Sequence, residues 1–562
     1  MSRLRGFQTD VKMGCYRAWA DGARCVMPVL PTGAGKTVIM GDIAREYPGY
    51  GCAIAHRSEL VGQISVALAR EGLRHDIVAP DATIRTIVRS HMDEVGRSYF
   101  DPRAKWKVAS VDTILRRKMD TNWLRQVGLV FQDEGHHVLK DNKWGRAFSL
   151  FENARGLFPT ATPIRADGKG LGSHSDGMVD ALVEGPDMRW LIDQGYLTDY
   201  KLIAPLTSDL DMHGVDISSV TGDYNTDQMR KRVKSSSKII GDVVATYLQH
   251  ARGLKGITFA VDVEHATQIA DAFNAAGVAA QVVHAETPDG DRARYMRMFR
   301  RGELKQLVNV DLFGEGVDVP DVQVVSMARP TMSYGLFAQQ FGRALRLMIS
   351  VVLSGAWDTY TPEQRKRFIA DSGKPTAIII DHVGNIVTHY GPPDMRKVPW
   401  SLDPRVKGRK VSDAIPLRAC VNPMCLQPYE RIYALCPYCG VEPPPPRDPT
   451  RPEHVDGDMV LYTPEMLHAL FGSKYKVDGP CYIPQGVGVE AVSAIKRRHR
   501  ERQEAQQLLR AAMLLVMPPN IDQRMAQRRF FHWFGVDTFT AQVLGSSDAD
   551  ELRQRITERL HR

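Results

Sequence analysis

Short apolar runs alternate with amphipathic stretches of helical period along most of the chain. Buried parallel strands form continuous apolar runs, and a helix usually connects each strand to the next. We therefore predict a parallel α/β sheet over residues 24–170 and a second one that begins near residue 238. The predicted strands are 28–30, 52–56, 106–110, 128–134 and 156–163 in the first sheet, and 256–261, 279–284, 306–311, 322–327 and 376–382 in the second.

The regions outside these two blocks have different patterns. Residues 171–237 are mixed, and we interpret the basic, serine-rich "RKRVKSSSK" within them as a linker or an exposed loop. The proline-rich "VEPPPPRDPTRP" predicts a stiff spacer over residues 442–455, the clearest domain boundary in the chain. Residues 456–562 are predicted to be mainly helical, with a charged helix over 490–515.

Length and charge narrow the class of protein. A chain of 562 residues has room for about three or four domains. Its 73 basic and 65 acidic residues give a net charge of +8, which suits a polyanionic partner. No apolar run approaches the roughly 18 residues of a membrane span, and the N-terminus has no apolar signal segment. We therefore predict a cytosolic protein without membrane attachment, with Cys15, Cys25, Cys52 and Cys481 as buried free thiols.

The stretch "PVLPTGAGKTVIM" (28–40) joins a predicted strand to a predicted helix. A glycine-rich loop there turns backbone N–H groups toward an anion, while its lysine reaches the β- and γ-phosphates and its threonine holds magnesium. Leu30 stands where the general phosphate-loop pattern has glycine, and an ordinary glycine-rich turn is the alternative interpretation. The predicted nucleotide ligands are Thr32, Gly33, Ala34, Gly35, Lys36 and Thr37, with Thr37 also a ligand of magnesium.

Two carboxylates end a later apolar strand, in "LVFQDEGHHVL". There Asp133 can hold magnesium through water, and Glu134 can act as general base toward the attacking water. His136 and His137 have no matching metal ligands nearby, so we interpret them as a relay of the nucleotide state. Only the first α/β block has a phosphate loop, which favours a nucleotide held between two domains over a small-molecule kinase or a GTPase.

As a set, these motifs resemble those of superfamily 2 helicases of the DEAD/DEAH type. "PTGAGKT", "DEGHH" and "TATP" resemble motifs I, II and III in their order and spacing. In the second block, "VNVDLFGEGVDVP" (308–320) resembles motif V and "QQFGRALR" (339–346) resembles motif VI.

Two further segments and two departures complete the resemblance. "IAHRSELVGQ" looks like motif Ia, and "LRGFQ" looks like the adenine-recognition motif with Gly6 in place of proline. Gly135 replaces the usual alanine of D-E-A-H, a change small enough to leave the carboxylates in place. The resemblance covers about residues 1–400. It is greatest to phage- and prophage-encoded helicases of the group that includes XPB-like and restriction-motor-like proteins.

The resemblance implies two RecA-like domains, over residues 1–200 and 201–400, with ATP hydrolysis in the cleft between them. Arg343 and Arg346 share one face if their segment is helical, and they would reach the γ-phosphate as arginine fingers; a basic surface helix is the alternative. Thr160 and Thr162 are interpreted as coupling the cleft to DNA. The implied catalytic residues are Lys36, Glu134, Arg343 and Arg346. The implied nucleotide contacts outside the loop are Gln8 at the adenine edge, Gly316 and Asp318 near the ribose, and Asp133 and Gln339.

A cysteine cluster and an aromatic segment follow the two blocks. Cys420, Cys425, Cys436 and Cys439 have spacings typical of a tetrahedral zinc ribbon, which we predict over residues 415–441; a redox or unpaired cluster is the alternative. The basic start of the helix predicted over 494–517 is a solvated face or a DNA or partner surface. The aromatics of "QRRFFHWFGVD" favour a small core over base stacking.

We therefore predict an α/β protein with two tandem RecA-like parallel-sheet domains, a zinc ribbon and a mainly helical C-terminal domain. The predicted function is that of an ATP-dependent DNA helicase or translocase with ATP, magnesium and zinc, in the cytoplasm of a bacterial host cell. Its DNA would be single-stranded, forked or duplex, and residues 456–562 would recruit replication or recombination proteins. The alternatives are a duplex-DNA translocase or branch-remodelling motor of a restriction or defence system, and a nucleic-acid-binding scaffold switched by ATP.

Overall fold

The structure is a computed structural model that divides into two compact units, Met1–Asp394 with Val398–Lys410, and Met395–Lys397 with Val411–Arg562. It describes residues 4–404 apart from 56–57, 166, 206–222, 226–227, 230–237, 311–320, 390 and 396–399. Beyond residue 404 it describes 417–419, 428–430, 435, 440–441, 459–463, 467, 489–517, 530, 533–534, 541 and 546–560.

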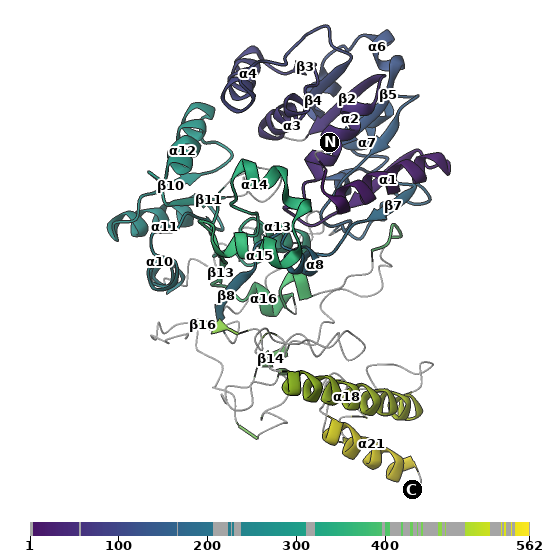
Figure 1. The fold of residues 1–562 in the computed structure, drawn as a ribbon, viewed down its shortest axis with the longest axis vertical. Coiled ribbons are helices and arrows are strands. Elements are labelled where there is room, and N and C mark those ends of the chain that lie inside the picture. The colour runs from purple at the N-terminus through teal and green to yellow at the C-terminus, as the bar shows by residue number, and fades with distance from the viewer. Residues whose placement is uncertain are drawn as a thin grey trace. The chain divides into compact units, whose positions relative to one another are not determined.

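The first sheet of unit 1 is parallel, and its described strands run in the order β3-β4-β2-β5-β6-β1-β7. Their bounds are β1 Cys25–Val29, β2 Tyr50–Ala55, β3 His75–Val78, β4 Trp106–Ser110, β5 Val127–Gln132, β6 Arg155–Leu157 and β7 Ala181–Glu184. The helices of this half, purple and blue in Figure 1, are α1 Gly6–Ala20, α2 Lys36–Glu46, α3 Ser58–Arg70, α4 Asp81–Val95, α5 Val111–Arg116, α6 Thr121–Gln126 and α7 Lys143–Ser149, with the 3₁₀ turn η1 Gly135–His137. Phe131, Phe148 and Phe158 are fully buried in its core.

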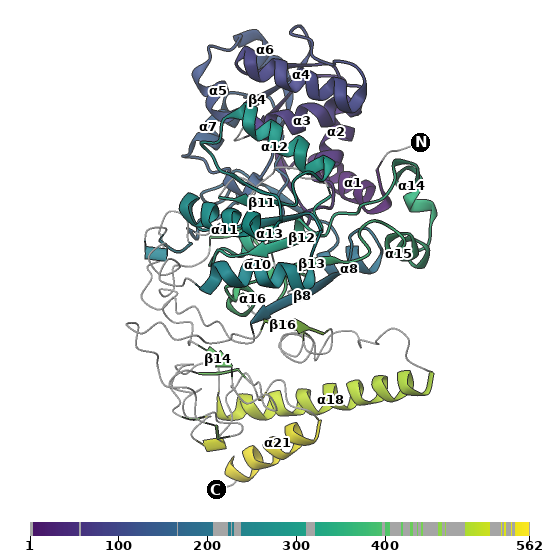
Figure 2. The same cartoon turned by 90° about the vertical axis from the view of Figure 1, so that its left-hand side faces the viewer.

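A second parallel sheet, in the order β10-β11-β9-β12-β13-β8, forms the other half of unit 1. Its strands are β8 Tyr200–Pro205, β9 Gly256–Phe259, β10 Ala280–Val283, β11 Gln306–Asn309, β12 Val324–Met327 and β13 Ala377–Asp381. The accompanying helices, teal and green in Figures 1 and 2, are α8 Met188–Asp193, α10 Lys238–His250, α11 Val263–Ala275, α12 Asp289–Arg301, α13 Tyr334–Gly342, α14 Val351–Gly355, η2 Trp357–Thr359, α15 Pro362–Ala370, α16 Asn385–Thr388 and η3 Pro393–Met395. The chain thus contains two tandem RecA-like domains, as the sequence predicts.

Every strand predicted in the two blocks is confirmed, although most are shorter than predicted. The predicted strand 156–163 ends at Leu157, because Pro159 has no N–H to donate to a neighbouring strand. Thr160 then makes only an isolated bridge to Val29. The sequence did not predict β3, β7 and β8, which are short or carry half-exposed residues. The predicted domain boundary between residues 200 and 201 falls at the start of β8.

Unit 2 contains the elements described beyond residue 410. They are the antiparallel pair β14 Leu417–Ala419 and β15 Pro428–Glu430, the strand β16 Met459–Tyr462, and the helices α18 Val489–Val516 and α21 Ser546–Leu560. α18 matches the helix predicted over 490–515, and it packs beside α21, as both figures show in yellow-green and yellow. Phe530 and Phe534 are buried in the core of this helical pair, which favours the core interpretation of the aromatic segment over base stacking.

Three further predictions concern the cysteines and membranes. Cys15, Cys25 and Cys52 are buried free thiols, as predicted, and burial raises the pKa of Cys15 to about 12. Cys481 and the four cysteines of the predicted zinc ribbon, Cys420, Cys425, Cys436 and Cys439, lie outside the described residues. Among the residues that the structure describes, no helix is long and apolar enough to cross a membrane.

Candidate functional site

The loop between β1 and α2 has the backbone of an anion cradle. Gly33 and Gly35 have φ values of 89° and 83°, in the left-handed region that only glycine adopts at little cost. Gly35 caps α2, so Lys36 and Thr37 stand in the first turn of that helix, where backbone N–H groups point outward and the helix dipole is positive. A Cβ at Gly35 would lie 2.4 Å from Gln8 Nε2, so a side chain there would displace the Gln8 amide.

Leu30, which replaces the usual glycine, has a packing role. Its side chain is fully buried, and a Cβ at Gly185 would lie 2.3 Å from Leu30 Cδ2. The Leu30 side chain therefore fills the space between the loop and the segment that follows β7. The Leu30 carbonyl accepts a 3.2 Å hydrogen bond from Lys36 Nζ. Burial lowers the pKa of Lys36, and the carboxylates of Glu134 and Asp133 oppose that shift.

Asp133 and Glu134 follow β5 and are almost fully buried, with 8% and 5% exposure. Glu134 adopts φ 52° and ψ 55°, an uncommon backbone conformation for a residue other than glycine, and its N–H donates to Asp133 Oδ1 at 3.0 Å. A Cβ at Gly135 would lie 2.3 Å from the Phe158 carbonyl oxygen. Glycine at this position therefore permits the close approach of the two segments that places both carboxylates in the site.

A chain of contacts leads from Glu134 to the second domain. His136 Nδ1 lies 3.5 Å from Glu134 Oε2 and 2.9 Å from Thr160 Oγ1. Thr160 Oγ1 accepts the N–H of Thr162 at 3.2 Å. A Cβ at Gly335, in the first turn of α13, would lie 2.9 Å from Thr162 Oγ1. The geometry fits the predicted relay, although it runs here between the two domains.

His137 has a different environment. Its ring stacks on Trp144 at 5.3 Å between centroids, which indicates a packing role. Among the described residues, no group of three or more His, Cys, Asp or Glu could hold a metal ion.

α13 presents its C-terminal end to the phosphate loop. Gln339 Nε2 donates to Glu134 Oε2 at 3.4 Å, and a Cβ at Gly342 would lie 2.7 Å from Thr32 Cβ. Arg343 and Arg346 lie just beyond α13, which ends at Gly342, and the Leu345 N–H donates to the Gly342 carbonyl. The condition for a shared helical face, that this segment is helical, is therefore not met.

One cavity of about 840 Å³ nevertheless collects the predicted residues of both domains. Arg343 is only 3% exposed, and burial lowers the pKa of Arg346 to about 10, which leaves it cationic at neutral pH. Gly316 and Asp318 lie outside the described residues. The predicted residues that line the cavity are Thr32, Gly33, Gly35, Lys36, Thr37, Asp133, Glu134, Gln339, Arg343 and Arg346.

Gln8 lies behind the loop, with 4% exposure. Its Nε2 donates to the Ala34 carbonyl at 2.8 Å, and its Oε1 accepts the N–H of Arg5 at 2.9 Å. Both polar groups of the Gln8 amide are therefore hydrogen-bonded to protein backbone in this structure. Recognition of adenine by Gln8 stays a prediction.

A second cluster, which no pattern in the sequence indicates, includes Arg5 and Tyr196 of the cavity lining. The guanidinium groups of Arg5 and Arg365 lie 5.2 and 4.3 Å from the centroid of the Tyr196 ring. Asp358 accepts the Tyr196 hydroxyl at 2.5 Å and the N–H of Gly6 at 3.0 Å. A carboxylate of the segment between α14 and α15 thus binds the positive N-terminus of α1.

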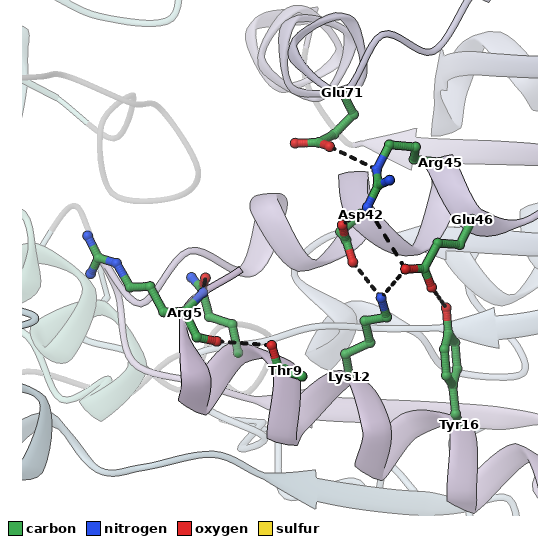
Figure 3. Close-up of polar contacts among 9 residues, drawn as sticks. Arg5, Thr9, Lys12, Tyr16, Asp42, Arg45, Glu46 and Glu71 are labelled. Atoms are coloured by element: carbon green, nitrogen blue, oxygen red, sulfur yellow. Dashed lines mark hydrogen bonds and ion pairs between the residues drawn. The ribbon is translucent and has the colours of Figure 1, made fainter. Parts of the chain in front are cut away.

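An ion network fixes α1 against the loop helix α2 (Figure 3). Lys12 Nζ lies 2.5 Å from Asp42 and 2.6 Å from Glu46, and the Tyr16 hydroxyl donates to Glu46 at 3.0 Å. Arg45 bonds Asp42 as well, and its Nε lies 3.2 Å from Glu71. Burial alone would raise the pKa of Asp42, but hydrogen bonds from Lys12 and Arg45 outweigh it and hold the pKa below its usual value.

The Asp42 side chain is 1% exposed, and its buried charge is compensated by two cations, Lys12 from α1 and Arg45 from α2 itself. The network therefore fixes the position of α1, and with it Gln8, relative to the phosphate loop that Gln8 contacts. It holds the N-terminal motif to the helix that follows the phosphate loop.

The fold and the site together define a class of protein: tandem RecA-like ATPases whose nucleotide cavity is completed by both domains. Residues 3–165 match the family described as "Type III restriction enzyme, res subunit", and residues 237–348 match "Helicase conserved C-terminal domain". The chain belongs to the superfamily 2 helicases, ATP-dependent enzymes that act on nucleic acid, in the group related to XPB-like and restriction-motor-like proteins.

Three relatives illustrate the range of similarity. A "51.5 kDa protein" of Lactococcus phage (isolate 7-9) is 30% identical over 419 residues, which cover 73% of this chain and 76% of the phage protein. "Putative ATP-dependent helicase IRC3" of Saccharomyces cerevisiae is 28% identical over 369 residues, covering 61% of this chain and 49% of the yeast protein. "DNA 3'-5' translocase XPB2" of Sulfurisphaera tokodaii is 32% identical over 141 residues, covering 24% of this chain and 30% of that protein. The chain thus spans about half the length of the yeast relative.

Proposed function

We propose that this protein is an ATP-dependent DNA helicase or translocase that hydrolyses ATP between its two RecA-like domains. The supporting observation is that Lys36 and Glu134 of the first domain line the same cavity as Arg343 and Arg346 of the second. Phosphoryl transfer depends on positioning and on charge stabilisation, so residues of both domains must meet around the γ-phosphate. Hydrolysis would then require the closed arrangement of the two domains.

Each residue has a role in this proposal. The backbone of the loop and the Lys36 ammonium group bind the β- and γ-phosphates. Thr37 and Asp133 hold the magnesium ion, which neutralises charge on the phosphate oxygens when bound. Glu134 accepts a proton from the attacking water, and Gln339, at 3.4 Å, fixes the orientation of that carboxylate.

The remaining residues stabilise charge in the transition state, bind the nucleoside or contact the nucleic acid. Arg343 and Arg346 stabilise the charge that develops on the transferred phosphoryl group. Gln8 reads the adenine edge after release from Ala34, and Gly316 and Asp318 hold the loop near the ribose. Thr160 and Thr162 couple the cavity to the nucleic acid through the relay that starts at His136.

DNA is proposed as the nucleic acid because the net charge is +8 and one relative is named a DNA translocase. α12, in the second domain, contains several arginines. Two of them, Arg292 and Arg300, line the outer part of the cavity. The arginines of α12 are Arg292, Arg294, Arg297, Arg300 and Arg301.

Two alternatives are carried beside this proposal. The match to a restriction-enzyme subunit over residues 3–165 favours a duplex-DNA translocase without strand separation as the second candidate. An ATP-switched scaffold is less well supported, because the site retains Glu134, a general base that a switch does not need. Recruitment of replication or recombination proteins by residues 456–562, and a bacterial cytoplasmic location, stay predictions.

ATP hydrolysis measured side by side with single-stranded, forked and duplex DNA and with RNA tests the proposal. We expect DNA to stimulate hydrolysis, and the apparent DNA affinity to fall linearly with salt on a log–log plot, with a slope of about −0.9 per phosphate contact on duplex. Stimulation by duplex alone, without displacement of a labelled strand, would select the translocase. Equal rates without nucleic acid and with every DNA, at all salt concentrations, would refute the DNA-driven motor.

Zinc is proposed on sequence spacing, with one supporting observation: β14 ends immediately before Cys420 and pairs with β15, which follows Cys425. A structural zinc site supplies the folding energy of a small ribbon. Elemental analysis should therefore find about one zinc per chain, lost in the variant with Cys436→Ser and Cys439→Ser while nucleotide binding persists. Purified parent protein without zinc would end this proposal.

A further inference from the structure

A buried lysine outside all of the motifs contacts the backbone beside the arginine pair. Lys374 precedes β13 and is 2% exposed. Its ammonium group donates to the Val322 carbonyl at 2.9 Å and to the Ala344 carbonyl at 3.0 Å. Burying an ammonium group is costly unless hydrogen bonds compensate it, so these contacts are specific features of the fold.

The two carbonyls belong to segments that matter for the site. Ala344 lies between Arg343 and Arg346, just beyond the end of α13. At the end of a helix the last carbonyl groups have no N–H donors from a following helical turn, and such carbonyls attract a cation. Val322 leads into β12, a central strand of the second sheet. Lys374 therefore joins the short turn that carries both arginines to the rigid sheet.

One further contact holds the same turn from the other side. Leu345 accepts the N–H of Thr198 at 2.8 Å, which ties the turn to the segment that leads into β8. Of these two anchors, only Lys374 brings a charge. Charge-assisted hydrogen bonds are roughly twice as strong as neutral ones, so the protonation of Lys374 decides how firmly the turn is held.

The charged groups that face Lys374 are Arg346 and Asp321. Burial, and after it the charge of Arg346, lower the pKa of Lys374 to about 7, although Asp321 opposes the shift. Asp321 also forms an ion pair with Lys255 at 3.2 Å. Its charge therefore only partly compensates the positive charges of Lys374 and Arg346. Negative charge from a nucleotide phosphate beside Arg346 would reduce the repulsion and favour the protonated lysine.

We propose that Lys374 is a positioning residue for ATP hydrolysis, which holds Arg343 and Arg346 in place through the Ala344 carbonyl. The inference rests on the proposed role of the two arginines. Lys374 does not touch the nucleotide. It acts on the transition state through the arginines, so its loss reduces kcat and leaves ATP binding by the phosphate loop intact.

The first test is Lys374→Met, which keeps the length of the side chain and removes the donor. We expect kcat to fall by up to about 100-fold, the size expected for a misplaced catalytic group, with KM for ATP within about twofold of the parent. Lys105→Met is the matched control, because Lys105 is exposed at the amino end of β4, the sheet edge opposite the phosphate loop. It should leave both constants unchanged.

The second test is the pH profile of kcat. In the parent, the protonated lysine is the competent form, so kcat should decline as pH rises above about 7. Lys374→Arg keeps a cation that stays protonated well above pH 7, so this variant should restore activity relative to Lys374→Met and lose the decline that begins near pH 7. An unchanged alkaline decline in Lys374→Arg would overturn the proposal, even if Lys374→Met fails to fold.

A double variant separates this inference from the function on which it rests. If Arg343→Ala leaves kcat intact, the proposed role of the arginines is wrong whatever Lys374 does. If Arg343→Ala abolishes turnover, Lys374→Met added to it should have little further effect, because both act through one group. Parent-like kcat in a folded Lys374→Met, beside an inactive Arg343→Ala, would overturn the role of Lys374 alone.

Discussion

Lys36→Ala should abolish ATP hydrolysis and weaken nucleotide binding, whereas Glu134→Gln should bind ATP normally and fail to hydrolyse it. Lys36 stands in the first turn of α2, and in the proposed mechanism it interacts with the phosphates in both the ground state and the transition state. Glu134 is needed only for proton transfer from the water, so its loss should lower kcat by about 10²–10⁴-fold. Turnover by steady-state assay and affinity by titration calorimetry distinguish the two effects.

Two features of the site sharpen this comparison. Glutamine at position 134 keeps the shape that fits the uncommon backbone conformation there and can still contact Gln339. Lys105→Met controls for the loss of a positive charge far from the cavity. Equal loss of ATP binding in Lys36→Ala and Glu134→Gln would show that the roles are assigned incorrectly.

Removal of either arginine should have the second large effect. Arg343→Ala or Arg346→Ala should lower kcat by about 10³–10⁵-fold, as the loss of other arginine fingers does, with a much smaller change in ATP affinity. In the proposed mechanism, both arginines act from the second domain on charge that appears only in the transition state. Single-turnover hydrolysis at saturating ATP measures this step directly.

Arg103→Ala, at an exposed position before β4, is the matched control. It removes a guanidinium group from the first domain without touching the cavity. Retention of turnover in the double variant of Arg343 and Arg346 would mean that the second domain does not complete the site. The two-domain mechanism would then be wrong, while a function of the phosphate loop in nucleotide binding could persist.

The phosphate loop and the carboxylates could be predicted because each is a local pattern. Glycines at positions 33 and 35 are required by the positive φ of their own residues, and the identity of Lys36 follows from phosphate chemistry. The strand positions followed from continuous apolar runs for the same reason. Neither inference depends on residues that are distant in sequence.

Contacts across the chain could not be predicted in this way. Asp358 binds the N–H of Gly6 although 352 positions separate them, and no pattern in either segment marks the pair. The contact of Gly135 with the Phe158 carbonyl is likewise visible only when two strands are placed side by side. Lys374 resembles any surface lysine in the sequence, and only its burial and its two carbonyl partners reveal its position.

The place of β1 in its sheet has a consequence for the order in which the protein matures during synthesis. β1 pairs with β6 at Gly156 on one side and with β7 at Ala181 on the other. A nascent chain that has not yet emerged beyond Glu184 therefore carries the loop on an apolar strand with at least one unpaired side, the kind of edge that invites association with other chains. The ribosome must release nearly a third of the sequence before the loop is held on both sides.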